Sequence, residues 1–167
     1  MRTRLILAFA LLVLTAAACG DDDTGEEFAC DSLVSLDDVT ALFGEPAVFD
    51  TEISEEDPAA GMLDCVWASV ESADDEDDLQ VQLFQIQVYR GREYYAPDLM
   101  YEDPEPIAGI GEDAFFSPQL GVSTGFRDGD LVAFLTFSVI DTGEAPDSIT
   151  KKEQVIDLLR LVHDRLS

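Results

Sequence analysis

The first nineteen residues, MRTRLILAFALLVLTAAAC, constrain the rest of this chain most, because they decide where it folds. Two arginines precede an apolar run of ten residues, Leu5–Leu14, and a stretch of small residues then leads to Cys19. This order of segments is typical of a secretory signal peptide. The apolar run is too short to cross a membrane as a helix, which takes about 20 residues. We therefore predict that residues 1–18 are a signal peptide and that the remainder is exported.

The cysteine that follows the small residues resembles the lipobox cysteine of bacterial lipoproteins. The resemblance implies that Cys19 is diacylated, becomes the mature N-terminus and holds the protein on the outer face of the cell membrane. Ala16 occupies the place where the usual lipobox has leucine. The alternative is an ordinary signal peptide cleaved after Ala18, which leaves Cys19 as a free thiol. Two acyl chains are enough for stable anchoring, whereas one chain gives only reversible binding.

The charge of the chain limits its partners. It contains 36 acidic and 9 basic residues, and removal of residues 1–18 with their two arginines takes the formal net charge from -27 to -29. Nucleic acid is excluded as a partner, because its binding requires basic patches. An anionic membrane would repel the body, so the lipid on Cys19 is the predicted membrane contact. We interpret the charge as a device for solubility and self-avoidance, with salt adaptation as the alternative, and we expect a monomer.

The sequence divides into an anchor, a linker and one domain. Residues 19–28 are polar, acidic and without periodicity, which predicts a flexible tether. Residues 29–167 are long enough for a single globular domain with its own core.

Two further cysteines, Cys30 and Cys65, lie in this domain. An even pair in an oxidising compartment predicts a disulfide, and the alternative is two buried thiols. A bridge across about 35 residues would stabilise the fold by about 4 kcal/mol. Two cysteines and one histidine are too few for a zinc site, so no metal or cofactor is predicted.

The pattern of apolar residues predicts an α+β fold. A capping box at Ser35 starts a short amphipathic helix over residues 36–43, which Gly44 ends. Thr150 starts a second capping box before an amphipathic C-terminal helix that extends to Leu166. Strands are expected between the helices, at residues 47–53, 62–70, 79–90, 107–116, 121–127 and 130–140. We predict a single, mainly antiparallel sheet of about five strands with the two helices packed on it.

Two strands carry features that bear on the core. Trp67 shares a face with Cys65, so we interpret it as a core anchor beside the disulfide, with a ligand-stacking role as the alternative. In residues 79–90 the apolar positions change phase between Leu83 and Phe84, which indicates a bulge or a strand that serves two surfaces. The glutamines of this strand are expected on its solvent face; they are Gln80, Gln82, Gln85 and Gln87.

The best candidate for a ligand or partner surface is the stretch from Gly91 to Pro106. It contains four large amphipathic side chains among acids and prolines, namely Tyr94, Tyr95, Met100 and Tyr101. Such residues in a loop are typical of contact surfaces. The alternative is a loop that folds back over the sheet and buries them.

No catalytic residue is predicted. The pattern Gly-x-Ser-x-Gly occurs at residues 121–125, but it falls inside an expected strand and not at a strand-to-helix turn, so it is not read as a nucleophile elbow. The single histidine, His163, lies near the charged end of the last helix, where a surface role is favoured over a catalytic one. The acidic residues 71–78 lack the spacing of an EF-hand loop. The chain is therefore expected not to be an enzyme.

The assembled features resemble a family of small actinobacterial lipoproteins, domain of unknown function 3558. The resemblance rests on the Cys19 lipobox, the stretch Cys30-Asp-Ser-Leu with the helix up to Gly44, the Cys65-Val-Trp67 strand, residues 109–116 and the C-terminal helix. It implies an exported and anchored α+β domain with a Cys30–Cys65 bridge, and it supplies no catalytic residues. We expect a binding module for an apolar ligand or an envelope protein. An envelope hydrolase and a purely structural surface protein are the alternatives.

Overall fold

The computed structural model describes residues 29–57, 62–69, 80–119, 121–141 and 148–167. The predicted signal peptide, the predicted lipidation site Cys19, the predicted tether and the acidic residues 71–78 lie outside the described residues. Within the described ranges, no helix is long and apolar enough to cross a membrane.

The described residues form one antiparallel sheet of eight strands, in the order β1-β3-β4-β8-β7-β6-β5, with β2 beside β1 on the same edge of β3. The α+β class and the single antiparallel sheet are thus confirmed, and the expected number of about five strands is too low. The strands are β1 Ala47–Phe49, β2 Glu55–Asp57, β3 Met62–Ser69, β4 Gln80–Arg90, β5 Glu105–Pro106, β6 Asp113–Ser117, β7 Val122–Asp128 and β8 Leu131–Asp141.

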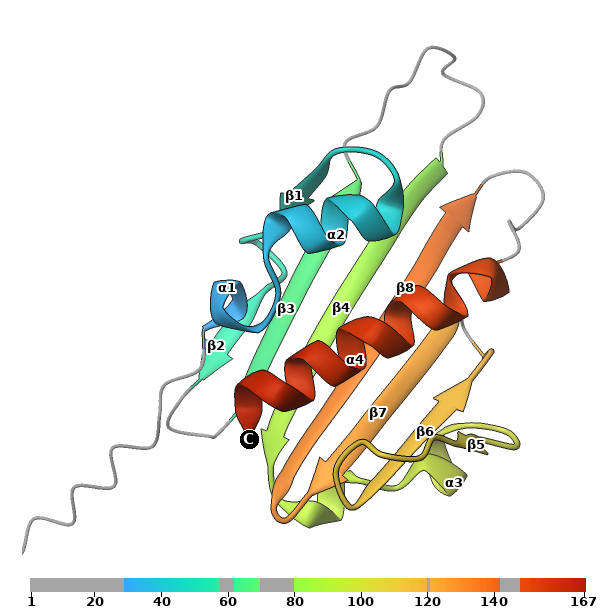
Figure 1. Ribbon diagram of the computed structural model, residues 1–167. Coiled ribbons are helices and arrows are strands. Elements are labelled where there is room, and N and C mark those ends of the chain that lie inside the picture. The colour runs from blue at the N-terminus through green and yellow to red at the C-terminus, as the bar shows by residue number, and fades with distance from the viewer. Residues whose placement is uncertain (1–28, 58–61, 70–79, 120, 142–147) are drawn as a thin grey trace, which may run out of the picture.

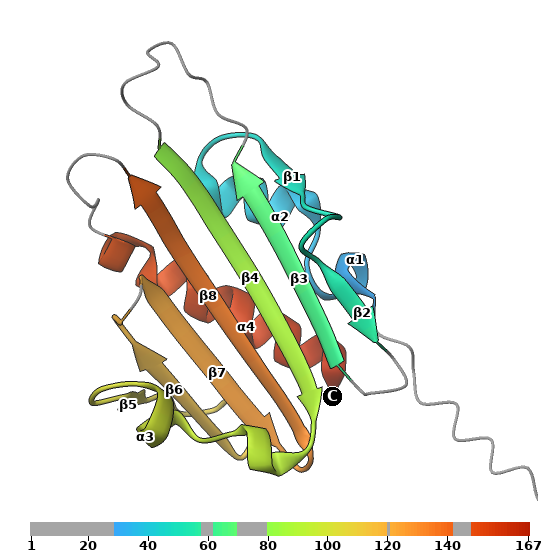
Figure 2. The same ribbon diagram turned by 180° about the vertical axis from the view of Figure 1, so that it is seen from behind.

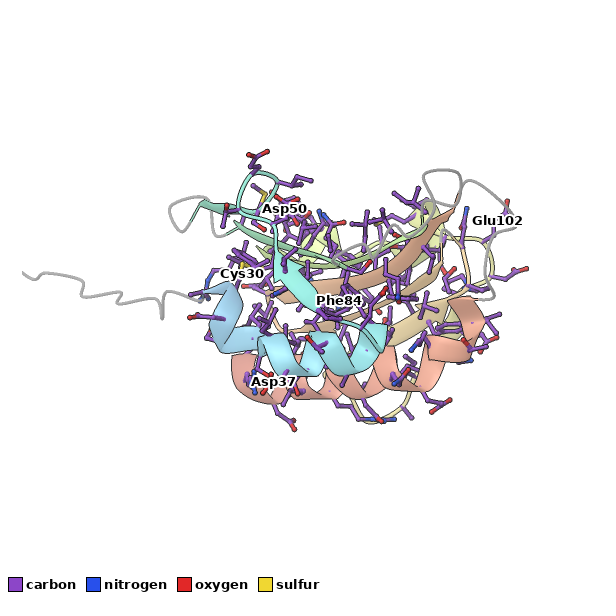
Figure 3. The ribbon with its side chains drawn as sticks, turned by 90° about the horizontal axis from the view of Figure 1, so that it is seen from above. Cys30, Asp37, Asp50, Phe84 and Glu102 are labelled. Carbon is purple, nitrogen blue, oxygen red and sulfur yellow. A yellow bond between two sulfur atoms is a disulfide. The ribbon has the colours of Figure 1, made fainter. Side chains whose placement is uncertain are left out.

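The longer helices cover one face of the sheet (Figure 1). On this helix face lie α1 (Cys30–Leu33), α2 (Leu36–Phe43) and α4 (Lys152–Leu166), the last preceded by the short helix η2 (Ser148–Lys151). The opposite face, which we call the second face, carries the short helices η1 (Arg92–Tyr94) and α3 (Pro97–Met100) at one end (Figure 2). Seen along the sheet, Phe84 lies between the strands and the helices, while Glu102 lies on the other side of the sheet (Figure 3).

Helix α2 has the bounds that its sequence predicts. The Ser35 hydroxyl accepts a hydrogen bond from the Asp38 amide, and the Asp38 carboxylate accepts one from the Ser35 amide. At the other end Gly44 has φ +79°, a left-handed conformation that glycine adopts without strain. Both ends of the helix are therefore fixed by local chemistry.

Helix α4 buries the predicted stripe but starts differently. Val155, Leu158, Leu159 and Val162 are buried against the sheet. The N-cap is not Thr150, as predicted, because the 3₁₀ turn η2 continues into the helix; the N-cap is Lys151, which makes no side-chain capping bond. Packing of the apolar stripe, rather than a cap, fixes this helix on the sheet.

Strand β4 serves two surfaces, and the alternative of a bulge is wrong. Its pairing with β8 is unbroken from Gln80 opposite Asp141 to Arg90 opposite Leu131. Side chains alternate strictly along such a strand. The change of phase therefore arises because both faces of β4 carry apolar residues, in its first half on the second face and in its second half on the helix face.

The glutamines of β4 divide between the two faces, which corrects the expectation that they share one. Gln82 lies on the helix face, where its amide donates to the carbonyl oxygen of Phe43 at 3.2 Å and to the Glu45 carboxylate. On the second face, the amides of Gln85 and Gln87 donate to the Asp64 carboxylate at 2.8–3.0 Å. Gln85 and Gln87 are therefore hydrogen-bonded within the sheet, whereas Gln82 joins the sheet to the end of α2.

The predicted disulfide is present and ties the helix layer to the sheet. Cys30 in α1 and Cys65 in β3 are joined at an S–S distance of 2.05 Å, and both are buried. Trp67 is 3% exposed and packs against Phe49 and Phe84, with ring centroids 5.4 and 5.8 Å apart. Trp67 is therefore a core residue, as its pattern indicates.

Candidate functional site

A tyrosine-rich segment lies over the second face, close to the ends of β4, β6 and β7. We call residues 92–103 the tyrosine segment; it contains η1 and α3. Gly91 starts it with φ +142°, where an added Cβ would lie 2.7 Å from the Glu93 side chain, so the turn requires glycine. Its amide donates to the carbonyl oxygen of Asp130 at 2.7 Å, which joins the segment to the β7–β8 hairpin. Pro97 opens α3, and the Tyr101 amide closes it by donating to the Pro97 carbonyl at 2.8 Å.

Two tyrosines of the segment point into a small aromatic core on the second face. The rings of Tyr95 and Tyr101 lie 6.1 and 4.9 Å from that of Phe115, and Tyr95 also stacks on Phe134 at 6.3 Å. Phe115, Phe134 and Val132 are buried beneath them. Aromatic pairs at such distances add about 0.5–1.5 kcal/mol each to the free energy of burial. The segment is therefore seated on the sheet by its own side chains.

The remaining large side chains of the segment face solvent. Leu99 is 88% exposed, and Tyr94 and Met100 are half exposed. Tyr94 keeps a fixed position because its ring stacks on Tyr89 of β4, with centroids 5.0 Å apart. A well-seated segment thus presents three exposed apolar or aromatic side chains.

The structure divides the four residues of the predicted surface into two pairs. Tyr95 and Tyr101 fold back onto the sheet, while Tyr94 and Met100 remain on the surface. Sequence reasoning missed Leu99, the most exposed large apolar residue in the part of the chain that the structure describes. Its signal is its position directly before Met100 in the stretch that carries the other large side chains.

An open groove of about 530 Å³ lies between the tyrosine segment and strands β6 and β7. Each wall carries one cation and one anion, Arg92 and Asp98 on the segment and Arg127 and Asp113 on the strands. The groove is completed by less polar residues, namely Tyr95, Ala96, Pro97 and Leu99.

The Arg127 side chain has a fixed position at this groove. It is 19% exposed, pairs with the Glu112 carboxylate, and its guanidinium carbon lies 5.9 Å from the centre of the Tyr95 ring. A cation over an aromatic face is held by the negative charge density of the ring. Arg92, by contrast, forms no ion pair with any residue that the structure describes.

The Tyr95 hydroxyl is buried beside the groove and has no hydrogen-bond partner among the described residues. Burial raises the pKa of this phenol well above its ordinary value, and the nearby charge of Asp113 raises it further, while Arg127 acts in the opposite direction. An unsatisfied buried hydroxyl costs about 1–3 kcal/mol.

His163 is more buried than predicted, but its contacts do not form a catalytic triad. Its Nε2 atom lies 3.1 Å from an Asp128 carboxylate oxygen and 3.3 Å from the Ser167 hydroxyl. In a triad the acid and the nucleophile contact opposite ring nitrogens. The Ser167 hydroxyl also donates to the His163 carbonyl at 2.6 Å. With the ring packed against Phe126 at 4.9 Å, the histidine ties α4 to the β7–β8 turn.

Other features of the described chain point to no chemistry. No group of three or more metal-ligating side chains occurs in the residues searched, which exclude the acidic stretch at 71–78. A second groove, of about 300 Å³, lies between α2 and α4 and is lined mainly by Ala41, Leu42, Leu158 and Leu161.

Comparison of the chain with protein-family models, with curated proteins and with solved structures finds no match.

Proposed function

We propose that the protein is an exported lipoprotein, anchored by a lipid on Cys19, whose folded body is a non-catalytic module that binds an envelope protein. The contact surface is the exposed side of the tyrosine segment, formed by Tyr94, Leu99 and Met100. The resemblance to the actinobacterial lipoprotein family and the signal-like N-terminus support the export and the anchor.

The observation that carries the binding role is the exposure of Leu99 on a segment that is otherwise firmly seated. Beneath it, Tyr95 and Tyr101 pack into the aromatic core, so Leu99 has little freedom to turn inward. Burial of a leucine side chain in a partner is worth about 1.5–3 kcal/mol. Interfaces gain most of their energy from a few such fixed apolar anchors surrounded by a polar rim. Here the rim is supplied by Glu93, Asp98 and Glu102, which are exposed.

The partner is a protein rather than a free apolar ligand. The groove beside the segment is open and carries four charged side chains, whereas sites for apolar ligands are largely enclosed and lined by apolar residues. A tether of ten residues from Cys19 to Ala29 reaches at most about 35 Å, so a partner must lie in or near the same membrane.

Photo-crosslinking in intact cells tests the binding role. A photoreactive amino acid is placed at Leu99, and in a matched control at Leu36, a leucine that is 50% exposed on the helix layer. We expect a discrete adduct with an envelope protein from position 99 and none from position 36. No adduct from position 99, or the same adducts from both positions, would refute the proposed surface. An adduct with lipid alone would show that this surface binds an apolar ligand and not a protein.

The anchor is tested with Cys19→Ser. We expect this variant to lose both its incorporation of a labelled fatty acid and its membrane association, while a protein that keeps both contradicts lipidation at Cys19.

A further inference from the structure

We propose that the groove between the tyrosine segment and strands β6 and β7 binds a small zwitterion with an apolar side chain, of the amino-acid or dipeptide class. This site is distinct from the proposed protein contact and shares with it Leu99 and the rim residue Asp98. The volume of about 530 Å³ is within the range of about 300–1,000 Å³ that is usual for small-molecule sites.

The charges that line the groove select for a zwitterion. Two of the seven basic residues that follow residue 18 are found here, in a chain with 36 acidic residues. Arg92 and Arg127 are matched by Asp98 and Asp113, so the lining has no net charge. A simple anion would be repelled by the surrounding negative charge, and a simple cation would leave the two guanidinium groups unused. A molecule with both charges and no net charge fits both conditions.

Each type of lining group has a role in binding such a ligand. Arg92 has no ion pair within the described residues and offers its planar donors to a carboxylate. Arg127 is already held by Glu112 and by the Tyr95 ring, so it adds positive charge at little cost in side-chain entropy. Asp98, which likewise has no ion pair in the described part of the chain, accepts from an ammonium group.

The apolar part of the ligand is received by the segment itself. Tyr95, Pro97 and Leu99 line the groove beside the charged groups, so charged and apolar surfaces lie within the same space. A single molecule bound in the groove can therefore contact both kinds of surface.

The Tyr95 hydroxyl is an independent observation that points to the same site. It is buried beside the groove and has no hydrogen-bond partner in the described structure. Buried polar groups in folded proteins almost always have a partner, and the exceptions tend to be functional. A small shift of the segment on binding gives this hydroxyl a ligand carboxylate or ammonium group as its partner.

Calorimetric titration of the full-length protein in non-ionic detergent tests the site with four probes. These are leucine, leucyl-leucine, N-acetyl-leucyl-leucine and leucyl-leucinamide, the last two of which each lack one charge. We expect leucine or leucyl-leucine to bind. If leucyl-leucine binds, each capped peptide should bind at least about tenfold more weakly than leucyl-leucine does. If leucine alone binds, neither capped peptide should bind. Whether leucine or leucyl-leucine binds more tightly distinguishes a free amino acid from a peptide as the ligand. Capped peptides that bind as well as leucyl-leucine, or no binding of either zwitterion at about 10 mM, would overturn the proposal.

A pair of variants connects binding to this groove. Arg92→Gln is expected to lower the affinity about tenfold, as for the loss of one charge-assisted hydrogen bond. The matched control, Arg160→Gln, removes an exposed arginine from α4 and is expected to leave the affinity unchanged. Equal effects of the two variants would contradict the site. Arg92→Gln leaves the crosslink from Leu99 intact, so the zwitterion site and the protein contact can fail separately.

Discussion

The substitution Gly125→Ala tests whether the second face has a tightly packed core of its own. Gly125 lies on β7 directly between Phe115 on β6 and Phe134 on β8. An added Cβ would lie 2.7 Å from Phe134 Cδ1, 2.8 Å from Phe115 Cε1 and 2.8 Å from the carbonyl oxygen of Ala133. All three distances are shorter than carbon atoms tolerate, and one of them involves backbone.

Two effects compete in this substitution, and the structure decides between them. Replacing glycine by alanine inside a strand normally stabilises a protein by about 0.5–1 kcal/mol. Overpacking of a filled core costs about 1–3 kcal/mol. Because both rings must move and the carbonyl cannot, we expect Gly125→Ala to lower the free energy of unfolding by about 1–2 kcal/mol. The rings that move are those on which Tyr95 and Tyr101 rest, so the tyrosine segment loosens as well.

Urea denaturation measures this change, and a double-mutant cycle assigns it to the rings. Phe115→Leu shortens one of the two side chains that meet the new Cβ. If the clash is the cause, Phe115→Leu costs at least about 0.5 kcal/mol less in the Gly125→Ala protein than in the wild type. A neutral or stabilising Gly125→Ala, or two effects that simply add, would refute the packing argument.

Three further predictions concern the disulfide, the helix cap and the buried phenol. Joint replacement of Cys30 and Cys65 by alanine is expected to lower the free energy of unfolding by about 4 kcal/mol, since the bridge closes 35 residues, and a loss below about 1 kcal/mol in urea denaturation contradicts this. A hydrogen bond from the Ser35 side chain and, to a smaller extent, one from the Ser35 backbone hold the pKa of Asp38 below its ordinary value. The stability that the ionised Asp38 carboxylate gives to the fold is therefore present above about pH 4 and is lost as pH falls through the lowered pKa. Carboxyl NMR titration should show this pKa returning toward its ordinary value in Ser35→Ala, and an unchanged titration is the contrary result. Tyr95→Phe removes an unsatisfied buried hydroxyl and should raise the free energy of unfolding by about 1 kcal/mol. In an absorbance titration, the variant should lose the tyrosine transition that occurs at the highest pH. A marked loss of stability would show that the hydroxyl has a partner.

Features fixed by neighbours in sequence were predictable. The Ser35 box and Gly44 determine both ends of α2, and the Asp128-Gly129 pair marks the β7–β8 hairpin, whose turn has φ +60° at Gly129. The disulfide was predictable from the number of cysteines and the predicted export, without knowledge of the fold.

Features fixed by distant strands were not predictable. Strand β2 was missed because residues 54–60 contain three acids and a proline, and its pairing comes only from β3. The phase change in β4 was ambiguous because a bulge and a two-faced strand give the same pattern, and only the unbroken pairing with β8 separates them. The division of the tyrosines was hidden for the same reason, since Phe115 and Phe134 come from strands later in the chain.

The two-faced character of β4 and β8 explains why the site lies on the second face. The helices bury one face of these strands, including Phe84, Leu135 and Phe137. The other face carries Val132 and Phe134, which must also be removed from water, and the tyrosine segment covers them at one end. Tyr95 and Tyr101, on either side of α3, anchor the segment on this core, and Leu99, within α3, points outward. The cover that completes the second core thereby creates both the exposed leucine and the charged groove beside it.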